Sequence, residues 1–262
     1  MVNTDTVRAT SFRAACGRVL QLVHTVVIYL WTVSATAICA PAAILLGLID
    51  RSGRCSHRVA RVWGRSILFV SRVKVATEGL SHIDPGRSYI YMSNHQSNFD
   101  IPVMLACLKV EFRWLAKKEL FNIPIFGHGM RGAGYISIDR SDRRAAIESL
   151  REAARIIRSG VSVLIFPEGT RSMDGRILPF KKGGFILAID AEVPLVPIVV
   201  RGTRAIMPKK RLLIKPGRVF LEVKPPVDAG AYTRADKEAL MDTIRTTICD
   251  GFERGGGGTA QC

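Results

Sequence analysis

His95 and Asp100 have the types and the spacing of a general base and the carboxylate that orients it. They stand five residues apart in the run NHQSNFD, at positions 94–100. A carboxylate on one imidazole nitrogen fixes the tautomer and leaves the other nitrogen to take a proton from a substrate. On one straight helix, residues five apart point about 140° away from each other. The pair therefore needs a turn between its members. Without one, Asp100 is only a helix cap and His95 a turn residue.

The elements around the pair are expected to supply that turn. Residues 89–93 (YIYMS) predict a strand that ends just before the motif. Pro102 suits the first turn of a helix, and the helical pattern continues to Leu108. A strand, a turn and a helix in this order let Asp100, at the helix start, reach back to His95.

A second candidate site follows a predicted strand at residues 164–166. Pro167 ends this strand, and the motif FPEGTRS continues into a turn that contains Gly169 and Arg171. In α/β domains, ligands bind at turns that follow the carboxyl ends of strands. The guanidinium fork of Arg171 matches phosphate oxygens, and backbone N–H groups near Gly169 can assist. The alternative for an isolated EGTR turn is a surface loop with a solvated arginine.

Strands and helices alternate along the rest of the chain. This alternation predicts an α/β layered domain, with a mixed or parallel central sheet flanked by helices. The clearest helices are expected at residues 142–159, with Ser141 or Asp142 as the N-cap, and at residues 232–252. The remaining strands are expected at residues 73–77, 135–138, 162–166, 195–200 and 219–223.

The N-terminal region contains a long apolar segment. From Val19 to Ile49, 31 residues include no Asp, Glu, Lys or Arg. As one helix they would span roughly 46 Å, more than the ~30 Å hydrocarbon core of a bilayer. Pro41 lies inside this run and is expected to kink or end a helix. Arginines flank both ends, which favours a bent helix pair in the cytosolic leaflet over a single transmembrane helix.

Length and these patterns divide the chain into three segments. A chain of 262 residues suits one domain with a short appendage. We expect a membrane-associating helical segment at 1–72, an α/β domain at 73–252 and a flexible glycine-rich tail at 253–262.

Composition restricts the kinds of partner. The chain has 38 Lys and Arg against 22 Asp and Glu, a formal net charge of +16. This excess favours anionic partners such as a membrane surface. An aromatic content of 7%, with no recognised binding signature, argues against nucleic acid. The six cysteines form no CxxC pair and show no zinc-ligand spacing, so we expect no metal site and interpret the thiols as reduced and cytosolic.

Several motifs occur together in one order along the chain. They are NHQSNFD (94–100), AKKELFNIPIFG (116–127), GYISIDR (134–140), FPEGTRS (166–172) and VPLVPI (193–198). In this order and spacing the chain resembles the glycerophospholipid acyltransferase family, and within it the bacterial 1-acylglycerol-3-phosphate O-acyltransferases. The resemblance covers roughly residues 75–205.

The resemblance implies a role for each candidate residue. His95 would be the general base and Asp100 the carboxylate that orients it. The residues implied to bind the phosphate of the acceptor are Arg171, Arg140, Lys117, Glu168, Gly169 and Thr170. For Arg140, the alternative is a salt bridge with Asp139 or Asp142. For Lys117, the sequence alone does not separate it from its neighbour Lys118.

The activity implied is transfer of a fatty acyl chain from acyl-CoA, or from acyl carrier protein, to the sn-2 hydroxyl of 1-acylglycerol-3-phosphate (lysophosphatidate). The product would be phosphatidate, in phospholipid biosynthesis. No G-x-S-x-G elbow is present, so direct attack by the hydroxyl is expected instead of an acyl-enzyme. We expect no metal or redox cofactor, and a location at the cytoplasmic membrane with the catalytic domain on the cytosolic face.

Two alternatives remain open on the sequence. The first keeps the chemistry and changes the acceptor to glycerol-3-phosphate, another lysophospholipid or an amino-acid lipid. The second is a non-catalytic protein that uses its positive charge to bind an anionic membrane.

Overall fold

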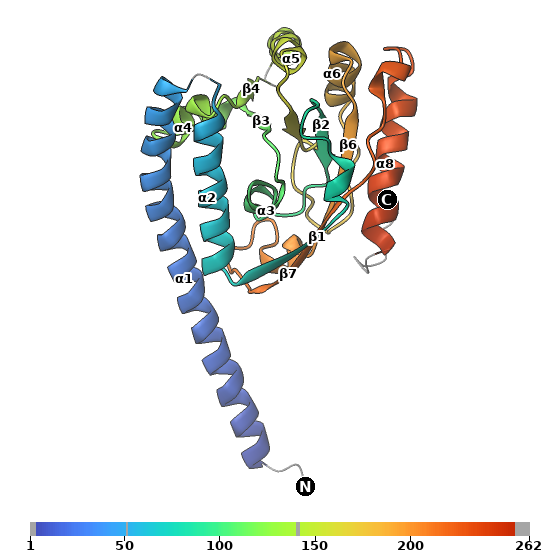
Figure 1. Cartoon of the computed structure of the whole chain (residues 1–262). Coiled ribbons are helices and arrows are strands. Elements are labelled where there is room, and N and C mark those ends of the chain that lie inside the picture. Colours follow the sequence, from blue (N-terminus) through green and yellow to red (C-terminus); the bar gives the residue numbers. More distant parts are fainter. Residues whose placement is uncertain (1–3, 51, 140–141, 255–262) are drawn as a thin grey trace.

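The computed structural model describes residues 4–50, 52–139 and 142–254 (Figure 1). Its helices and strands, in chain order, are α1 (Thr4–Ile49), α2 (Arg54–Val70), β1 (Val73–Glu78), β2 (Ile90–Ser93), α3 (Asp100–Cys107), β3 (Arg113–Lys117), α4 (Phe126–Gly132), β4 (Ile136–Ile138), α5 (Arg143–Arg158), β5 (Val163–Ile165), α6 (Gly183–Ala191), β6 (Leu195–Arg201), α7 (Thr203–Ile206), β7 (Gly217–Val223) and α8 (Lys237–Arg254).

The strands form one seven-stranded sheet in the order β1-β7-β6-β2-β5-β3-β4. The strands β6, β2, β5, β3 and β4 run parallel to one another, and β7 is antiparallel to β6. The predicted α/β class with a mixed sheet is therefore confirmed. β2 lies inside the sheet, with β5 on one side and β6 on the other.

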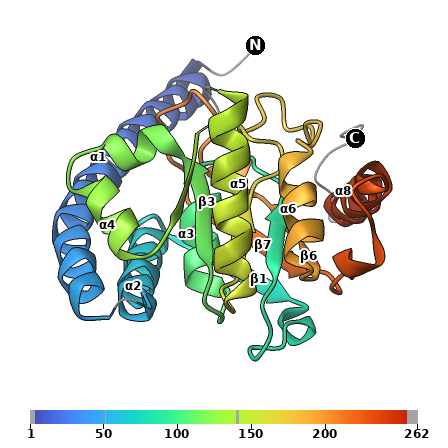
Figure 2. The ribbon, with the colours of Figure 1, turned by 90° about the horizontal axis from the view of Figure 1, so that it is seen from above.

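Helices cover both faces of the sheet, which explains why β2 carries apolar side chains on both of its faces. Tyr89 and Tyr91 point into a core shared with α2 and α3, whereas Ile90 and Met92 point into a core shared with α5, α6 and α8. A strand buried on both faces has no polar side. Figure 2 shows α5 and α6 crossing the face of the sheet opposite α3.

The N-terminal segment is a pair of antiparallel helices, but its turn is not at Pro41. α1 continues through Pro41 to Ile49, and α2 begins at Arg54 and runs back along α1. Asp50 accepts a hydrogen bond from the Cys55 N–H at 2.9 Å. Polar contacts hold α2 beside α1, including Trp63 Nε1 to Thr36 Oγ1 at 3.0 Å and Ser56 Oγ to the Ala43 carbonyl at 2.8 Å. These tertiary contacts keep the helix intact although proline removes one backbone hydrogen bond.

Small residues allow α4 to pack closely against the second half of α1. A Cβ added to Gly132 would lie 2.9 Å from the Ala43 carbonyl oxygen, and one added to Gly129 would lie 3.2 Å from the Ala40 Cβ. Ile28 and Ile67, of α1 and α2, also belong to the core on the α3 side of the sheet. The C-terminal half of α1 and the helix α2 thus pack against the α/β domain.

Other local predictions were partly correct. The predicted helix at 142–159 is α5, with Asp142 accepting the Ala145 N–H as its N-cap. The last helix begins later than predicted, at Lys237, and includes the first residues of the expected tail. Residues 255–262 of that tail lie outside the described residues. The described free thiols are Cys16, Cys39, Cys55 and Cys107. Cys249 is disulfide-bonded, so the interpretation of all six cysteines as reduced is wrong.

Candidate active site

The two candidate motifs leave neighbouring parallel strands at the same edge of the sheet. β2 leads into the 94–100 motif and β5 leads into the FPEGTRS motif, with Met92 opposite Ile165 in the register. β2 also lies at a topological switch point of the sheet, because β5 is its neighbour on one side and β6 on the other. Ligands of open α/β sheets bind outside the carboxyl ends of strands at such a point.

The structure brings His95 and Asp100 together. His95 Nδ1 lies 2.8 Å from Asp100 Oδ2, which is a hydrogen-bond distance. The same oxygen accepts the backbone N–H groups of Gln96 at 2.7 Å and Ser97 at 2.9 Å. These N–H groups precede α3, whose N-cap is Phe99, so Asp100 is not the helix cap. Asp100 is fully buried, and its carboxylate fixes both the turn and the imidazole.

The imidazole is also held from its face. The rings of His95 and Phe166 are stacked, with centroids 3.8 Å apart and planes 6° apart. Phe166 in turn stacks on Trp114, at 5.4 Å between centroids. With Nδ1 committed to Asp100, Nε2 is the nitrogen available to a substrate. This is the geometry of a general base oriented by a carboxylate.

Glu168 accepts hydrogen bonds from two backbone N–H groups. Its Oε1 accepts the His95 N–H at 2.6 Å and its Oε2 accepts the Leu178 N–H at 3.0 Å. Burial raises the pKa of Glu168 to about 7, although both N–H donors oppose this shift. These contacts leave the predicted role of Glu168 in phosphate binding a prediction. A buried carboxylate that is already hydrogen-bonded has no free oxygen at the surface, and its contribution is to position His95.

Gly169, Thr170 and Arg171 form the turn beyond β5. Gly169 has a φ of 71°, a backbone conformation that favours glycine. The turn is tied to the first motif, because Ser172 N–H donates to the His95 carbonyl at 2.9 Å. It is also tied to Lys209, whose Nζ donates to the Arg171 carbonyl at 2.6 Å and the Thr170 Oγ1 at 3.0 Å.

Two further residues, Lys117 and Arg140, were predicted to bind phosphate. Lys117 ends β3 beside the cavity described below, and its Nζ pairs with Glu119 at 2.8 Å. Arg140 lies outside the described residues. Within the described part of the chain, no group of three or more His, Cys, Asp and Glu side chains could hold a metal ion.

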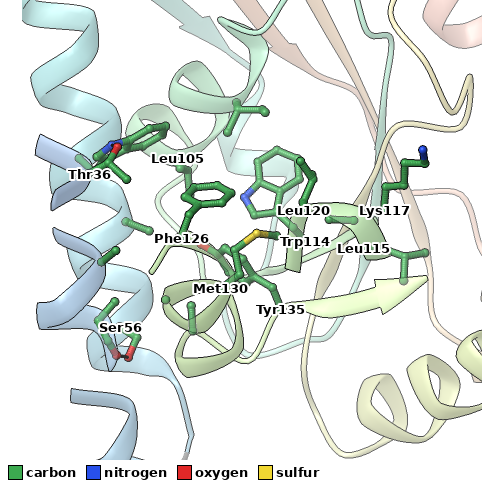
Figure 3. A pocket seen from close by; sticks show the side chains of 18 of the residues that line it. Thr36, Ser56, Leu105, Trp114, Leu115, Lys117, Leu120, Phe126, Met130 and Tyr135 are labelled. Carbon is green, nitrogen blue, oxygen red and sulfur yellow. Dashed lines mark hydrogen bonds between the residues drawn. The ribbon is translucent and has the colours of Figure 1, made fainter. Parts of the chain in front are cut away.

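A mostly apolar cavity of about 430 Å³ opens beside His95. Its walls come from α1, α2, α3, β3 and α4, and His95, Gly169, Thr170 and Arg171 line it together. Figure 3 shows Trp114, Phe126 and Met130 pointing into the same space, with Lys117 at the side away from Thr36. The arrangement joins a base, an arginine and a chamber suited to a hydrocarbon chain.

Sequence comparison identifies the family of this chain. A family model described as Acyltransferase matches residues 74–201. The chain is 35% identical over 207 residues to 1-acyl-sn-glycerol-3-phosphate acyltransferase alpha of Homo sapiens, which covers 76% of this chain and 73% of that protein. The chain belongs to the acyltransferase family. The resemblance drawn from the motifs is confirmed.

Two further relatives define the extent of the similarity. A chloroplastic 1-acyl-sn-glycerol-3-phosphate acyltransferase of Brassica napus is 39% identical over 206 residues, 78% of this chain and 58% of that protein. This chain thus spans less than two thirds of that relative. The crystal structure of the 1-acyl-sn-glycerophosphate acyltransferase PlsC from Thermotoga maritima matches with a TM-score of 0.80 at 27% identity, covering 93% of this chain and 99% of that chain.

Lys209 contacts this candidate site and was not predicted from the sequence. It stands 38 positions after Arg171 in a loop without a recognised motif. The only signal was the run Lys209-Lys210-Arg211, which is equally compatible with a solvated surface.

Proposed function

We propose that this protein transfers an acyl chain from a thioester donor to the sn-2 hydroxyl of lysophosphatidate, giving phosphatidate. The observation that carries the proposal is the His95–Asp100 pair at a cavity that Arg171 also lines. The names of the relatives from Homo sapiens and Thermotoga maritima support this acceptor.

In the proposed mechanism, His95 Nε2 removes the proton from the acceptor hydroxyl as its oxygen attacks the thioester carbonyl. The new C–O bond forms, the C–S bond breaks, and the thiolate leaves with the electron pair. The imidazolium, balanced by the Asp100 carboxylate, returns the proton to the leaving thiolate. The base is needed because an alcohol is a weak nucleophile until its proton is removed, whereas the thiolate leaves readily.

The cavity and the turn would bind different parts of the substrates. An acyl chain would occupy the apolar chamber, whose walls include Ala40, Met130 and Trp114. The phosphate of the acceptor would lie at the Gly169–Arg171 turn, with Lys117 nearby. Both ends then converge on His95, which places the hydroxyl and the carbonyl at the base.

The N-terminal helices support a location in one leaflet of the membrane. Cys16–Ile49 is the described segment long and apolar enough to cross a bilayer. One stripe of α1 packs on the domain, including Ile28, Ala35 and Ala43. Other positions of α1 expose apolar side chains such as Leu30, Val33 and Ile38. A helix packed lengthwise on the domain fits an interfacial position better than a perpendicular crossing. The arginines that flank the apolar segment favour a location of the catalytic domain on the cytosolic face. The acyl donor would be either acyl-CoA or acyl carrier protein.

A matrix of donors and acceptors tests the proposal. The wild type is incubated with acyl-CoA or acyl carrier protein, each with lysophosphatidate, glycerol-3-phosphate or another lysophospholipid. We expect phosphatidate from lysophosphatidate to form at the highest kcat/KM. A higher value with another acceptor would assign the same chemistry to that acceptor, and no transfer to any of them would exclude the enzyme.

A further inference from the structure

The loop of residues 207–215, before β7, connects the active site to α1. Its Met207 carbonyl accepts the Ser97 hydroxyl at 2.8 Å, inside the motif that holds Asp100. Farther along, the Leu212 carbonyl accepts the Tyr29 hydroxyl at 3.0 Å and the Ile214 N–H donates to Thr25 Oγ1 at 3.2 Å. This loop is the orange segment that leads into β7 in Figure 1.

The outer side of this loop is apolar and basic. Leu212 is 73% exposed and Leu213 is 42% exposed. Residues 203–217 contain Arg204, Lys209, Lys210, Arg211 and Lys215 and no acidic residue. Exposed leucines among cations are the pattern of a segment that lies at an anionic lipid surface.

The neighbouring surface identifies the occupant as lipid. The loop bonds to α1 at Thr25 and Tyr29, within the apolar Cys16–Ile49 segment. On α1, Val26, Val27 and Leu30 are exposed close to these contacts along the chain. The apolar side of the loop is thus continuous with the exposed side of a membrane-seeking helix.

The inner side of the loop reaches the catalytic edge through Lys209. Its ammonium donates to both the Arg171 carbonyl and the Thr170 hydroxyl, whereas Lys210, the next residue, is exposed. A charged hydrogen bond to the backbone of a turn restricts where its arginine can lie. The loop can therefore hold Arg171 in place only while its own conformation is held.

We propose that residues 207–215 dock Leu212 and Leu213 into an anionic bilayer and, through Lys209, position the Gly169–Arg171 turn for the lipid phosphate. The second half of this proposal rests on the proposed function, because it assumes that the turn binds phosphate. Lys209 is a positioning residue that acts through Arg171.

Tryptophan quenching tests the docking. Full-length Leu212→Trp is reconstituted in vesicles of phosphatidylcholine and phosphatidylglycerol, with and without brominated acyl chains. The matched control is Ile147→Trp, at a residue of similar size that is 41% exposed on α5, on the opposite side of the sheet. We expect Leu212→Trp to add brominated-lipid quenching beyond the wild type and Ile147→Trp to add none. Equal quenching of the two variants would overturn the docking, whether or not the protein proves to be an acyltransferase.

Two lysine variants test the positioning. Lys209→Met and its neighbour control Lys210→Met are compared on short-chain lysophosphatidate that does not aggregate, so that membrane docking does not contribute. We expect Lys209→Met to raise the Kd and KM for this acceptor roughly tenfold, with the KM for the donor and kcat nearly unchanged, as for loss of a charged hydrogen bond. Lys209→Arg should restore most of the affinity.

The outcomes separate the two ideas. Equal Kd values for Lys209→Met and Lys210→Met would overturn the positioning role of Lys209, as would the absence of acceptor binding to the wild type. Binding is measured by calorimetry and needs no turnover, so a protein that binds but does not transfer acyl groups would refute the proposed function alone.

Discussion

One oxygen of Asp100 accepts three hydrogen bonds. A substitution that keeps this oxygen can therefore remove the negative charge without removing the hydrogen bonds. His95 Nδ1 and the N–H groups of Gln96 and Ser97 all contact Oδ2. In Asp100→Asn, a single amide oxygen can occupy that position and accept all three bonds. The turn would then persist while the negative charge that balances a protonated imidazole is lost.

We predict that Asp100→Asn keeps a folded structure but lowers kcat by roughly 10²-fold or more, because the base loses its electrostatic partner. Asp100→Ala should in addition lower the melting temperature, because three donors in a buried turn lose their acceptor. Kinetics and thermal unfolding of the two variants check this. Wild-type kcat in Asp100→Asn would show that the carboxylate charge is unimportant.

The raised pKa of Glu168 makes the free energy of unfolding depend on pH, and the direction of the shift gives the sign of this dependence. Burial raises this pKa from 4.5 to about 7, so folding favours the protonated form. Its stabilising contribution is complete below pH 4.5 and is lost as the pH rises through about 7. A shift of this size corresponds to a contribution on the order of 3 kcal/mol.

Glu168→Gln removes this titration, so the comparison isolates it from the histidines. We expect the free energy of unfolding of the wild type, relative to Glu168→Gln, to fall between pH 4.5 and about 7 and then to level off. Unfolding in detergent at several pH values provides the measurement. A constant difference over this interval would show that Glu168 titrates at its usual pKa.

At the scale of elements, the contact between α1 and α4 sets the width of the cavity. Ala40, Ala43, Gly129, Met130 and Ala133 of these helices all line it. In Gly132→Ala, the new methyl group would lie 2.9 Å from the Ala43 carbonyl oxygen, so the two helices must separate. We predict a loss of stability of about 1–3 kcal/mol and a changed preference for acyl-chain length, measured with donors of increasing length.

Gly17→Ala is the matched control for this change. It adds the same methyl group to α1 where no atom lies within 4 Å. It should leave chain-length preference unchanged and stabilise the helix slightly, by up to about 1 kcal/mol. Identical behaviour of the two variants would show that the α1–α4 contact does not shape the cavity.

The elements that the sequence predicted well are those specified by local signals. The strand, turn and helix around His95 follow from a short apolar run and Pro102, and α5 follows from its helical period and Asp142. The strand β3 was not predicted, because the charged residues Arg113 and Lys117 at its ends interrupt the apolar pattern of a buried strand. Arg113 is nevertheless buried and donates to the Ser52 carbonyl at 2.6 Å.

The features that the sequence did not predict have non-local causes. Pro41 does not end α1, because packing against α2 and α4 compensates for the lost hydrogen bond. The contacts of Glu168 with backbone N–H groups 73 residues earlier and 10 residues later depend on the fold. The same is true of Lys209 and the Arg171 turn. The identities of the base and its carboxylate partner were visible in the motif, whereas the positioning contacts around them were not.

At the scale of the whole molecule, the fold places exposed apolar residues on the helices that line the cavity. α1 and α2 wall the cavity and also carry exposed apolar residues such as Leu48 and Phe69. A lipid acceptor could therefore reach His95 without leaving the interface. The net charge of +16 would hold this face against anionic headgroups. The same two helices thus line the cavity and carry the surface proposed to attach to the membrane.

Phosphatidate formation by His95→Ala is the most direct test of the central claim. Wild type, His95→Ala and the control His128→Ala, which alters an exposed histidine of α4, are assayed with acyl donor and lysophosphatidate in the same vesicles. We predict that His95→Ala binds the vesicles normally but forms phosphatidate at least about 10²-fold more slowly, while His128→Ala resembles the wild type. Phosphatidate formation by His95→Ala at the wild-type rate would contradict the assignment of His95 as the general base.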